Sequence, residues 1–293
     1  MLPLLYLLVA PPVFLLGPLA ALLLLSKPST LRESLWLGAS TAWLAIWLWQ
    51  PGGVAVQALR AVGVLASGAF VALSLARPAP VFRRALAATI AAFAALVLWC
   101  AAFGIGWSRL EAAVARELGQ TIGDVARQAE LALGADAAVP FWQAAQAARG
   151  WAPMVPGVVF VQAVLGLALG WMLHHAIARR PIGEPAAPFA AFRFSDQLIW
   201  LPVAGLALAL LPGGGIPRDV GGNLVLIAIA LYSARGMAVV RSGAGRVGVP
   251  ATTAAAIAVF VFLPFVVGGL TLLGLADTWL DFRRRMATPA TGG

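Results

Sequence analysis

Charged side chains are scarce in this chain of 293 residues. Only 11% of its residues are charged, whereas 61% are hydrophobic, and the mean hydropathy is +0.92. An average soluble domain has about 25% charged residues, so the polar groups present are too few to cover a surface exposed to water. The composition therefore excludes an ordinary soluble fold and favours a protein whose solvent is the lipid bilayer.

Reactive and metal-ligating residues are scarce as well. The one cysteine, Cys100, excludes an internal disulfide framework and a cysteine-based metal site. The sequence has no phosphate-binding P-loop motif and none of the usual metalloprotease or serine-hydrolase motifs. His174 and His175 are adjacent, and neighbouring side chains on a helix diverge by about 100°, so we expect solvated histidines at a membrane boundary rather than a chelating pair. The sequence thus predicts no catalytic residue, no cofactor and no metal, and a protein that is not an enzyme.

Basic residues give the chain a formal net charge of +9, and they concentrate in short loops between apolar stretches. This is the distribution that the positive-inside rule describes for the cytoplasmic loops of membrane proteins. No basic run alternates with aromatic residues in the manner of a nucleic-acid site, so we expect no nucleic-acid partner. The pattern predicts a multi-pass protein of the bacterial cytoplasmic (inner) membrane, with the lipid bilayer as its surroundings.

Eight apolar segments are candidates to cross the roughly 30 Å of bilayer hydrocarbon. Pro11 and Pro12 interrupt the first segment, which predicts a kink or two half-helices, and the sixth is short and contains Pro202. We expect an all-α polytopic bundle of about eight (seven to eight) transmembrane helices in a single domain, residues 1–285, with a disordered tail at 286–293. The segments are 2–25, 35–49, 54–75, 85–105, 155–177, 197–211, 221–240 and 251–275.

The segment 107–150 differs in composition, because it holds five of the 11 acidic residues. Its apolar residues recur at steps of three and four, as on one face of a helix. This predicts an amphipathic, extracytoplasmic insert that does not cross the membrane, with a second short helix at 141–149. The apolar positions are Leu110, Val114, Leu118, Ile122, Val125 and Ala129.

Loop charge also predicts an orientation. Four loops hold ten basic residues, whereas the short loops 50–53 and 212–220 hold only Arg218. The four loops are therefore expected in the cytoplasm and the N-terminus outside. The three arginines at 283–285 conflict with this, because eight alternating spans place the tail outside. The four loops are 26–33, 76–84, 178–198 and 241–250.

Ionisable residues inside apolar segments are site candidates, because a charge in hydrocarbon costs roughly 2.5–3.5 kcal/mol on insertion scales. Arg60 either extends to the membrane surface or faces a polar interior. Arg235 either extends to the surface or pairs with Asp277 or Asp196, and the pair with Asp277 requires a cytoplasmic tail. Asp277 and Asp281 share a helix face. They either anchor the helix end at the membrane surface or form a polar lock, that is, a polar contact with another helix or with a partner. The candidate residues are Arg60, Gln162, Asn223, Tyr232, Arg235, Asp277 and Asp281.

Small residues at four-residue steps indicate close helix packing. Such steps occur at Gly166 and Gly170 and at Ala87, Ala91 and Ala95. The simpler interpretation is packing inside the bundle. The alternative is a docking face for a partner subunit.

Three motifs in the second half of the chain carry a family resemblance. They are the stretch from Asn223 to Val240 with its Arg235-Gly236-Met237-Ala238-Val239 run, the ending from Gly274 to Arg283, and the aromatic-proline segment from Phe192 to Pro202. Over about residues 155–285 these motifs resemble the YybS-like membrane proteins, a family classed as a domain of unknown function. The resemblance implies a distant relation to the substrate-binding membrane subunits of energy-coupling-factor transporters. It implies binding of a small molecule in the membrane, dependence on a separate ATPase, and no catalytic residues.

Two functions remain as hypotheses. The first is a transport subunit, which predicts a cavity lined by polar groups such as Arg60, Gln162, Asn223 or Tyr232. The second is a structural or regulatory scaffold in an envelope complex with other membrane subunits, which predicts a filled bundle with 107–150 as an external platform. An intramembrane enzyme is least favoured, because no paired catalytic groups are present.

Overall fold

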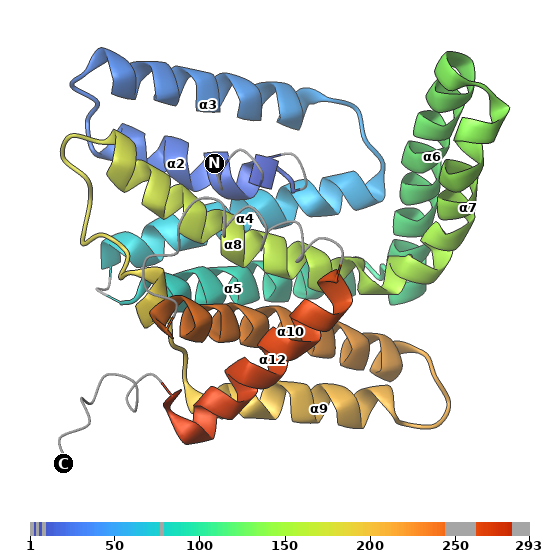
Figure 1. The fold of residues 1–293 in the computed structure, drawn as a ribbon. Coiled ribbons are helices and arrows are strands. Elements are labelled where there is room, and N and C mark those ends of the chain that lie inside the picture. The colour runs from blue at the N-terminus through green and yellow to red at the C-terminus, as the bar shows by residue number, and fades with distance from the viewer. Residues whose placement is uncertain (1–2, 4–5, 8–9, 77–78, 244–261, 283–293) are drawn as a thin grey trace. The chain divides into compact units, whose positions relative to one another are not determined.

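The computed structural model is all-helical wherever it describes the chain, which confirms the predicted fold class (Figure 1). The chain divides into two compact units, Met1–Ala186 and Ala187–Gly293. The predicted tail at 286–293 lies outside the described residues. Those residues are 3, 6–7, 10–76, 79–243 and 262–282.

The first unit is built from α-helices joined by short turns, with one 3₁₀ turn, η1 (Ala152–Met154), before its last helix. Its helices are α2 (Val13–Leu25), α3 (Leu31–Trp49), α4 (Val54–Ala76), α5 (Val81–Ala102), α6 (Trp107–Leu133), α7 (Ala135–Trp151) and α8 (Val155–Ile177).

Helix α2 is the centre of this first unit. It begins directly after Pro11 and Pro12, as the interruption of the first apolar segment predicts. It packs against α3, α4 and α8, and its side chains from Phe14 to Leu23 include several with no exposed surface. The hydrophobic core of the first unit is therefore a filled interior around one short helix.

Glycines let α8 approach α2 closely. A Cβ atom at Gly170 would lie 2.8 Å from the carbonyl oxygen of Leu15, and one at Gly166 would lie 2.7 Å from the Cβ of Phe14. The predicted packing of Gly166 and Gly170 inside the bundle is confirmed. The same prediction is wrong for Ala87 and Ala91, which are exposed, because α5 turns Ala85, Ala88 and Ala92 inward instead.

Five helical stretches of the described residues are long and apolar enough to cross a membrane. They coincide with five of the eight expected spans, although the last begins at Leu263, and residues 251–261 lie outside the described ranges. The segments 13–25 and 196–209 form shorter apolar helices, and α3 is not among the five. A count of seven to eight spans stays a prediction. The five stretches are Val54–Ala76, Val81–Ala102, Ala152–Ile177, Ile216–Ser242 and Leu263–Leu280.

Helices α6 and α7 form a hairpin in the region predicted as an amphipathic insert, and neither is a candidate span (Figure 1). Gly134 separates them with φ of +94°, a backbone angle that favours glycine. The second helix begins at Ala135, so its predicted start after Pro140 is wrong. Helix α7 instead continues through Pro140, which lies inside it.

A carboxylate joins this hairpin to a candidate span. The two carboxylate oxygens of Glu117 in α6 accept hydrogen bonds from the backbone N–H groups of Ala55 (3.1 Å) and Val56 (3.0 Å), in the first turn of α4. A negative charge at a helix N-terminus satisfies free N–H groups and the helix dipole. Gly53 leaves room for it, since a Cβ there would lie 2.1 Å from the carboxylate.

The second unit consists of three α-helices and two 3₁₀ turns among its described residues. They are η2 (Phe189–Ala191), η3 (Asp196–Ile199), α9 (Trp200–Ala209), α10 (Ile216–Gly243) and α12 (Leu263–Leu280).

Helices α10 and α12 cross and touch at glycines. A Cβ at Gly236 would lie 2.0 Å from the carbonyl oxygen of Leu270, and one at Gly274 would lie 2.0 Å from that of Tyr232. Near the same crossing, Arg235 contacts Asp277. These glycines therefore let the backbones of the two helices approach closely at one point.

The charge conflict at the end of the chain is not tested by the described residues. Helix α12 ends at Leu280, and the three arginines at 283–285 and most of the basic loop 241–250 lie outside the described ranges. The side of the membrane on which the tail lies therefore stays a prediction.

Candidate functional site

Arg235 of α10 is the centre of a buried charged cluster in the second unit. Its side chain is 4% exposed, and its Nε donates to Oδ2 of Asp277 at 3.0 Å. Its Nη2 donates to the backbone carbonyl of Asp277 at 3.2 Å. The side chain of Asp277 has no exposed surface. Of the two predictions for Arg235, the ion pair with Asp277 is therefore correct and the extension to the membrane surface is wrong.

A second carboxylate contacts the same guanidinium from the outside. Asp196 lies in η3, and its Oδ1 is 3.2 Å from Nη1 of Arg235. Its side chain is 70% exposed. Ser195 fixes the start of this turn, since its hydroxyl accepts a hydrogen bond from the backbone N–H of Gln197. Arg235 thus has one buried counter-ion and one exposed counter-ion.

Two aromatic rings complete the walls of the cluster. The ring of Phe194 lies 5.3 Å from Cζ of Arg235 and meets the ring of Tyr232 edge to face, with centroids 5.2 Å apart. Tyr232 is 1% exposed. Stacking on an aromatic face stabilises a guanidinium without neutralising it. The sequence placed Phe194 in the aromatic-proline motif but did not predict its contact with Arg235, because a motif does not tell which helix a loop residue packs against.

The segment before α9 is tied to the end of α12 by an ion pair. Arg193 pairs with Asp281, the residue that ends α12. Asp281 thus acts as a link to another segment of the second unit, in line with the predicted polar lock. Arg193 and Asp196 lie three residues apart on one loop and contact opposite charges on different helices. The loop is therefore attached to the cluster at two points.

Three predicted candidates lie elsewhere. Asn223 donates through Nδ2 to the backbone carbonyl of Asp219, one turn before it, at 2.7 Å. Twelve residues of helix, roughly 18 Å, separate it from Arg235. Arg60 and Gln162 belong to the first unit, whereas Asn223 and Tyr232 belong to the second. A cavity lined by all four residues therefore stays a prediction.

Arg60 of α4 is 5% exposed, and its guanidinium lies 5.4 Å from the centre of the Trp47 ring. Its predicted extension to the membrane surface is therefore wrong, because the side chain folds against an aromatic ring of α3. The backbone carbonyl of Gln162 accepts a hydrogen bond from the hydroxyl of Tyr6 at 2.8 Å. That contact holds α8 against the N-terminal segment.

The first unit has its own buried cation, Arg84 of α5. It is 7% exposed, and its guanidinium lies 4.1 Å from the ring centre of Trp171 and 5.8 Å from that of Phe70. The indole N–H of Trp171 donates to the backbone carbonyl of Glu184 at 3.2 Å. Arg84 is held by aromatic faces and lies in no ion pair among the described residues.

The two histidines lie beside this cluster, under the loop that follows α8. His174 has no exposed surface, and its Nε2 accepts the backbone N–H of Ile182 at 3.1 Å. His175 is half-buried against Trp171, with ring centroids 4.8 Å apart. The prediction of solvated histidines is wrong for His174, because the loop folds back over the helix end.

Glu33 joins the start of α3 to the end of α8. Its carboxylate accepts backbone N–H groups of Arg179 (2.6 Å), Ser29 (2.8 Å) and Thr30 (2.8 Å). These hydrogen bonds, led by that of Arg179, lower the pKa of Glu33 from 4.5 to about 2. The loops 26–33 and 178–186 therefore meet at one end of the first unit, as the charge pattern predicts for loops on one side of a membrane.

Metal chemistry has no visible basis in the part of the chain that the structure describes. No group of three or more histidine, cysteine or carboxylate side chains lies close enough there to hold a metal ion. The charged clusters are instead built from arginine, carboxylate and aromatic groups.

The helices and the buried charges define an all-helical, multi-pass membrane protein. The chain belongs to the family of predicted membrane proteins DUF2232, whose sequence profile matches residues 1–278. The YybS-like resemblance is thereby confirmed, and it extends through the first half of the chain, which the motifs of the second half did not reveal. No curated protein and no solved structure matches the chain.

Proposed function

We propose that this protein is a transport subunit that binds a small anion at Arg235 and lacks an ATPase of its own. The observation that carries the proposal is the pair of counter-ions on Arg235, one buried and one 70% exposed. An ionisable residue within a membrane segment is a functional candidate by default. The exposed carboxylate of Asp196 occupies the position that a carboxylate or phosphate ligand would take.

Charge balance supports exchange of Asp196 for a ligand. Asp277 neutralises Arg235 permanently, because both side chains are buried and two hydrogen bonds join them. Asp196 is a second partner with a solvated side chain, so water can replace its contact with Arg235 more readily than it can replace that of the buried Asp277. An incoming anion therefore replaces Asp196 at small cost, while Phe194 and Tyr232 provide the apolar walls that binding sites usually have.

The proposal includes a partner and a cellular place. The sequence has no P-loop, so movement of the anion depends on a separate ATPase, as the resemblance to energy-coupling-factor subunits implies. The protein is placed in a bacterial cytoplasmic membrane on the strength of its loop charges. It performs no covalent chemistry and acts by binding alone.

The test is affinity purification from native membranes, followed by mass spectrometry of the proteins and small molecules that copurify. The proposal expects an ATPase and an anionic small molecule with the wild-type chain. It also expects loss of the small molecule in an Arg235→Gln, Asp277→Asn double variant, in which no buried charge is left unpaired. Recovery of envelope-assembly proteins with no ATPase and no anion would overturn the proposal.

The second candidate function is a scaffold, and the α6–α7 hairpin favours it. The hairpin is fixed to α4 through Glu117, and it presents exposed apolar side chains near its tip, Leu131 at 89% and Leu133 at 77% exposed. The interior of the first unit is also filled with apolar side chains. A Leu131→Ser, Leu133→Ser variant distinguishes the two functions. It releases copurifying proteins if the hairpin is a platform and leaves the ATPase bound if the protein is a transport subunit.

A further inference from the structure

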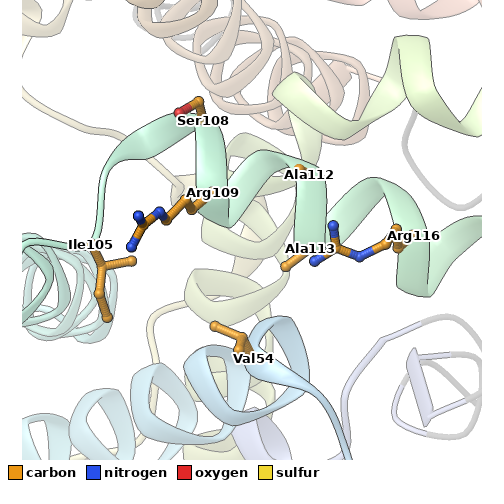
Figure 2. Close-up of a pocket in the computed structure, with 7 residues that line it drawn as sticks. All are labelled: Val54, Ile105, Ser108, Arg109, Ala112, Ala113 and Arg116. Atoms are coloured by element: carbon orange, nitrogen blue, oxygen red, sulfur yellow. The ribbon is translucent and has the colours of Figure 1, made fainter.

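A hollow of about 420 Å³ lies between the start of α6 and the start of α4 in the first unit (Figure 2). Pockets for small molecules commonly measure about 300–1,000 Å³, so the hollow is large enough for more than a bare ion. It is partly open rather than sealed. The lining residues are Val54, Ile105, Ser108, Arg109, Ala112, Ala113 and Arg116.

The spacing of residues along α6 creates this hollow. Arg109 and Arg116 are seven residues apart, which places them on one face of the helix. Ala112 and Ala113 lie between them, and these short side chains leave space that longer ones would fill. Figure 2 shows the Arg109 side chain extending towards Ile105 and that of Arg116 towards Ala113, on the side of α6 that faces Val54.

The two guanidinium groups have no counter-ion within the described residues. Both arginines are exposed, and neither forms an ion pair with a described carboxylate. Glu117, next to Arg116 along the chain, is held by the N–H groups of Ala55 and Val56 and does not line the hollow. Glu111, two residues from Arg109, does not line it either, and neither arginine pairs with it. Two positive charges therefore face a partly apolar hollow, which favours an anion that also carries apolar groups.

The hollow lies at the end of two candidate spans, where lipid headgroups lie. Val54 is the first residue of α4, and Ile105 follows α5, which ends at Ala102. Trp99 and Phe103, next to this end of α5, are 51% and 68% exposed, as in the aromatic belt at a membrane boundary. A lipid bound here places its phosphate between the arginines and its chains along the spans.

We infer that this hollow binds the phosphate headgroup of an anionic lipid through Arg109 and Arg116. Arginine binds phosphate through charge-assisted hydrogen bonds. Amphipathic helices with basic residues bind anionic lipid by the same combination of charge and apolar burial. The site anchors the hairpin to the bilayer at the junction that Glu117 stabilises. The inference is independent of the function proposed for Arg235, which lies in the other unit.

The test uses the full chain purified in a neutral detergent and titrated with phosphatidylglycerol, phosphatidylcholine or inorganic phosphate, with bound lipid measured by native mass spectrometry. We expect saturable binding of phosphatidylglycerol in preference to phosphatidylcholine. An Arg109→Gln, Arg116→Gln variant should bind phosphatidylglycerol about tenfold to thirtyfold more weakly, since each basic residue contributes roughly 1 kcal/mol at an anionic membrane surface. An Ala112→Leu variant should bind it more weakly as well, because the larger side chain fills the hollow.

Arg127→Gln is the matched control. Arg127 lies on α6 like the other two, but it is paired with Asp124 and does not line the hollow. Its replacement should leave lipid binding unchanged, and melting temperatures should show that all variants are folded. The inference is overturned if the double variant keeps the wild-type preference or if Arg127→Gln loses as much affinity. Displacement of phosphatidylglycerol by millimolar inorganic phosphate would also overturn it, because the site would then recognise the free anion.

Discussion

The two units of the chain hold a buried arginine in different ways. In the first unit, the guanidinium of Arg84 lies against the rings of Trp171 and Phe70. In the second unit, Arg235 contacts the carboxylates of Asp277 and Asp196. Both arginines are at most 7% exposed, so burial alone does not distinguish them.

The two arginines differ in whether a ligand could replace the group that contacts the guanidinium. An aromatic ring contributes to the core and cannot leave, so Arg84 is a fixed part of the packing of the first unit. Asp196 is exposed, and we propose that an anion from outside takes its place on Arg235. Whether a buried charge in a membrane protein is a candidate binding site therefore depends more on the chemical nature of its partner than on how deeply it is buried.

Asp277→Asn should have the largest effect on stability. It leaves the charge of Arg235 buried without its buried counter-ion, and breaking such a pair costs about 3–5 kcal/mol. We expect a large drop in the melting temperature of the detergent-solubilised protein, or loss of folded protein on expression. The Arg235→Gln, Asp277→Asn double variant should recover much of the loss, because it removes both charges. A single variant as stable as the wild type would contradict the structure.

Gly274→Ala should have the next largest effect. The new Cβ would lie 2.0 Å from the carbonyl oxygen of Tyr232, so α10 and α12 must separate, and such overpacking costs typically about 1–3 kcal/mol. Gly268→Ala is the matched control, since it lies on the same helix with nothing within 4 Å of the new Cβ. Thermal unfolding should show destabilisation by the first change and a neutral or stabilising effect of the second. Equal effects of the two changes would contradict the close packing of α10 and α12 at Gly274.

Arg84→Met should destabilise the protein less than Asp277→Asn. The change removes a cation–π contact worth roughly 0.5–2 kcal/mol but leaves no opposite charge unpaired. The comparison of the two units is sharpened by measuring both variants in one detergent. An Arg84→Met loss as large as that of Asp277→Asn would mean that the two arginines are held alike.

Glu33→Gln should have the smallest of these effects, and the effect should depend on pH. The pKa of Glu33 is lowered from 4.5 to about 2 in the folded protein, so the ionised carboxylate stabilises the fold above pH 4.5. This contribution is lost as the pH falls from 4.5 towards 2. The melting temperatures of wild type and variant should differ at pH 7 and converge as the pH falls from 4.5 to about 2. A difference that is constant over this range would contradict the proposed hydrogen bonds.

Hydropathy and loop charge predicted the parts of the fold that depend on local composition. They located α4, α5, α8 and α10 and the amphipathic hairpin, because lipid demands apolar segments and polar residues cannot be left in hydrocarbon without partners. They also predicted that loops 26–33 and 178–198 lie on the same side of the membrane, and the contact of Glu33 with Arg179 agrees with this.

Helix contacts and the course of side chains could not be predicted from such patterns. Hydropathy does not tell which helices cross or where, so the close approach of α10 and α12 emerges only from the contacts of Gly236 and Gly274. The inward course of Arg60 depends on Trp47, and the burial of His174 depends on a loop that folds back over α8. The pair of Arg235 with Asp277 was one of two alternatives, because the sequence did not tell on which side the tail lies.

Chemical rescue of an Asp196→Ala variant tests the exchangeable counter-ion most directly. Removal of Asp196 leaves the outer side of Arg235 open, so acetate should bind there and raise the melting temperature more than chloride at equal ionic strength. Asp124→Ala is the matched control, because Asp124 is also an exposed partner of an arginine, at 60% exposure, but its arginine has no buried carboxylate or aromatic wall. The account predicts a selective acetate effect in Asp196→Ala alone. Identical responses to acetate and chloride in that variant would contradict it.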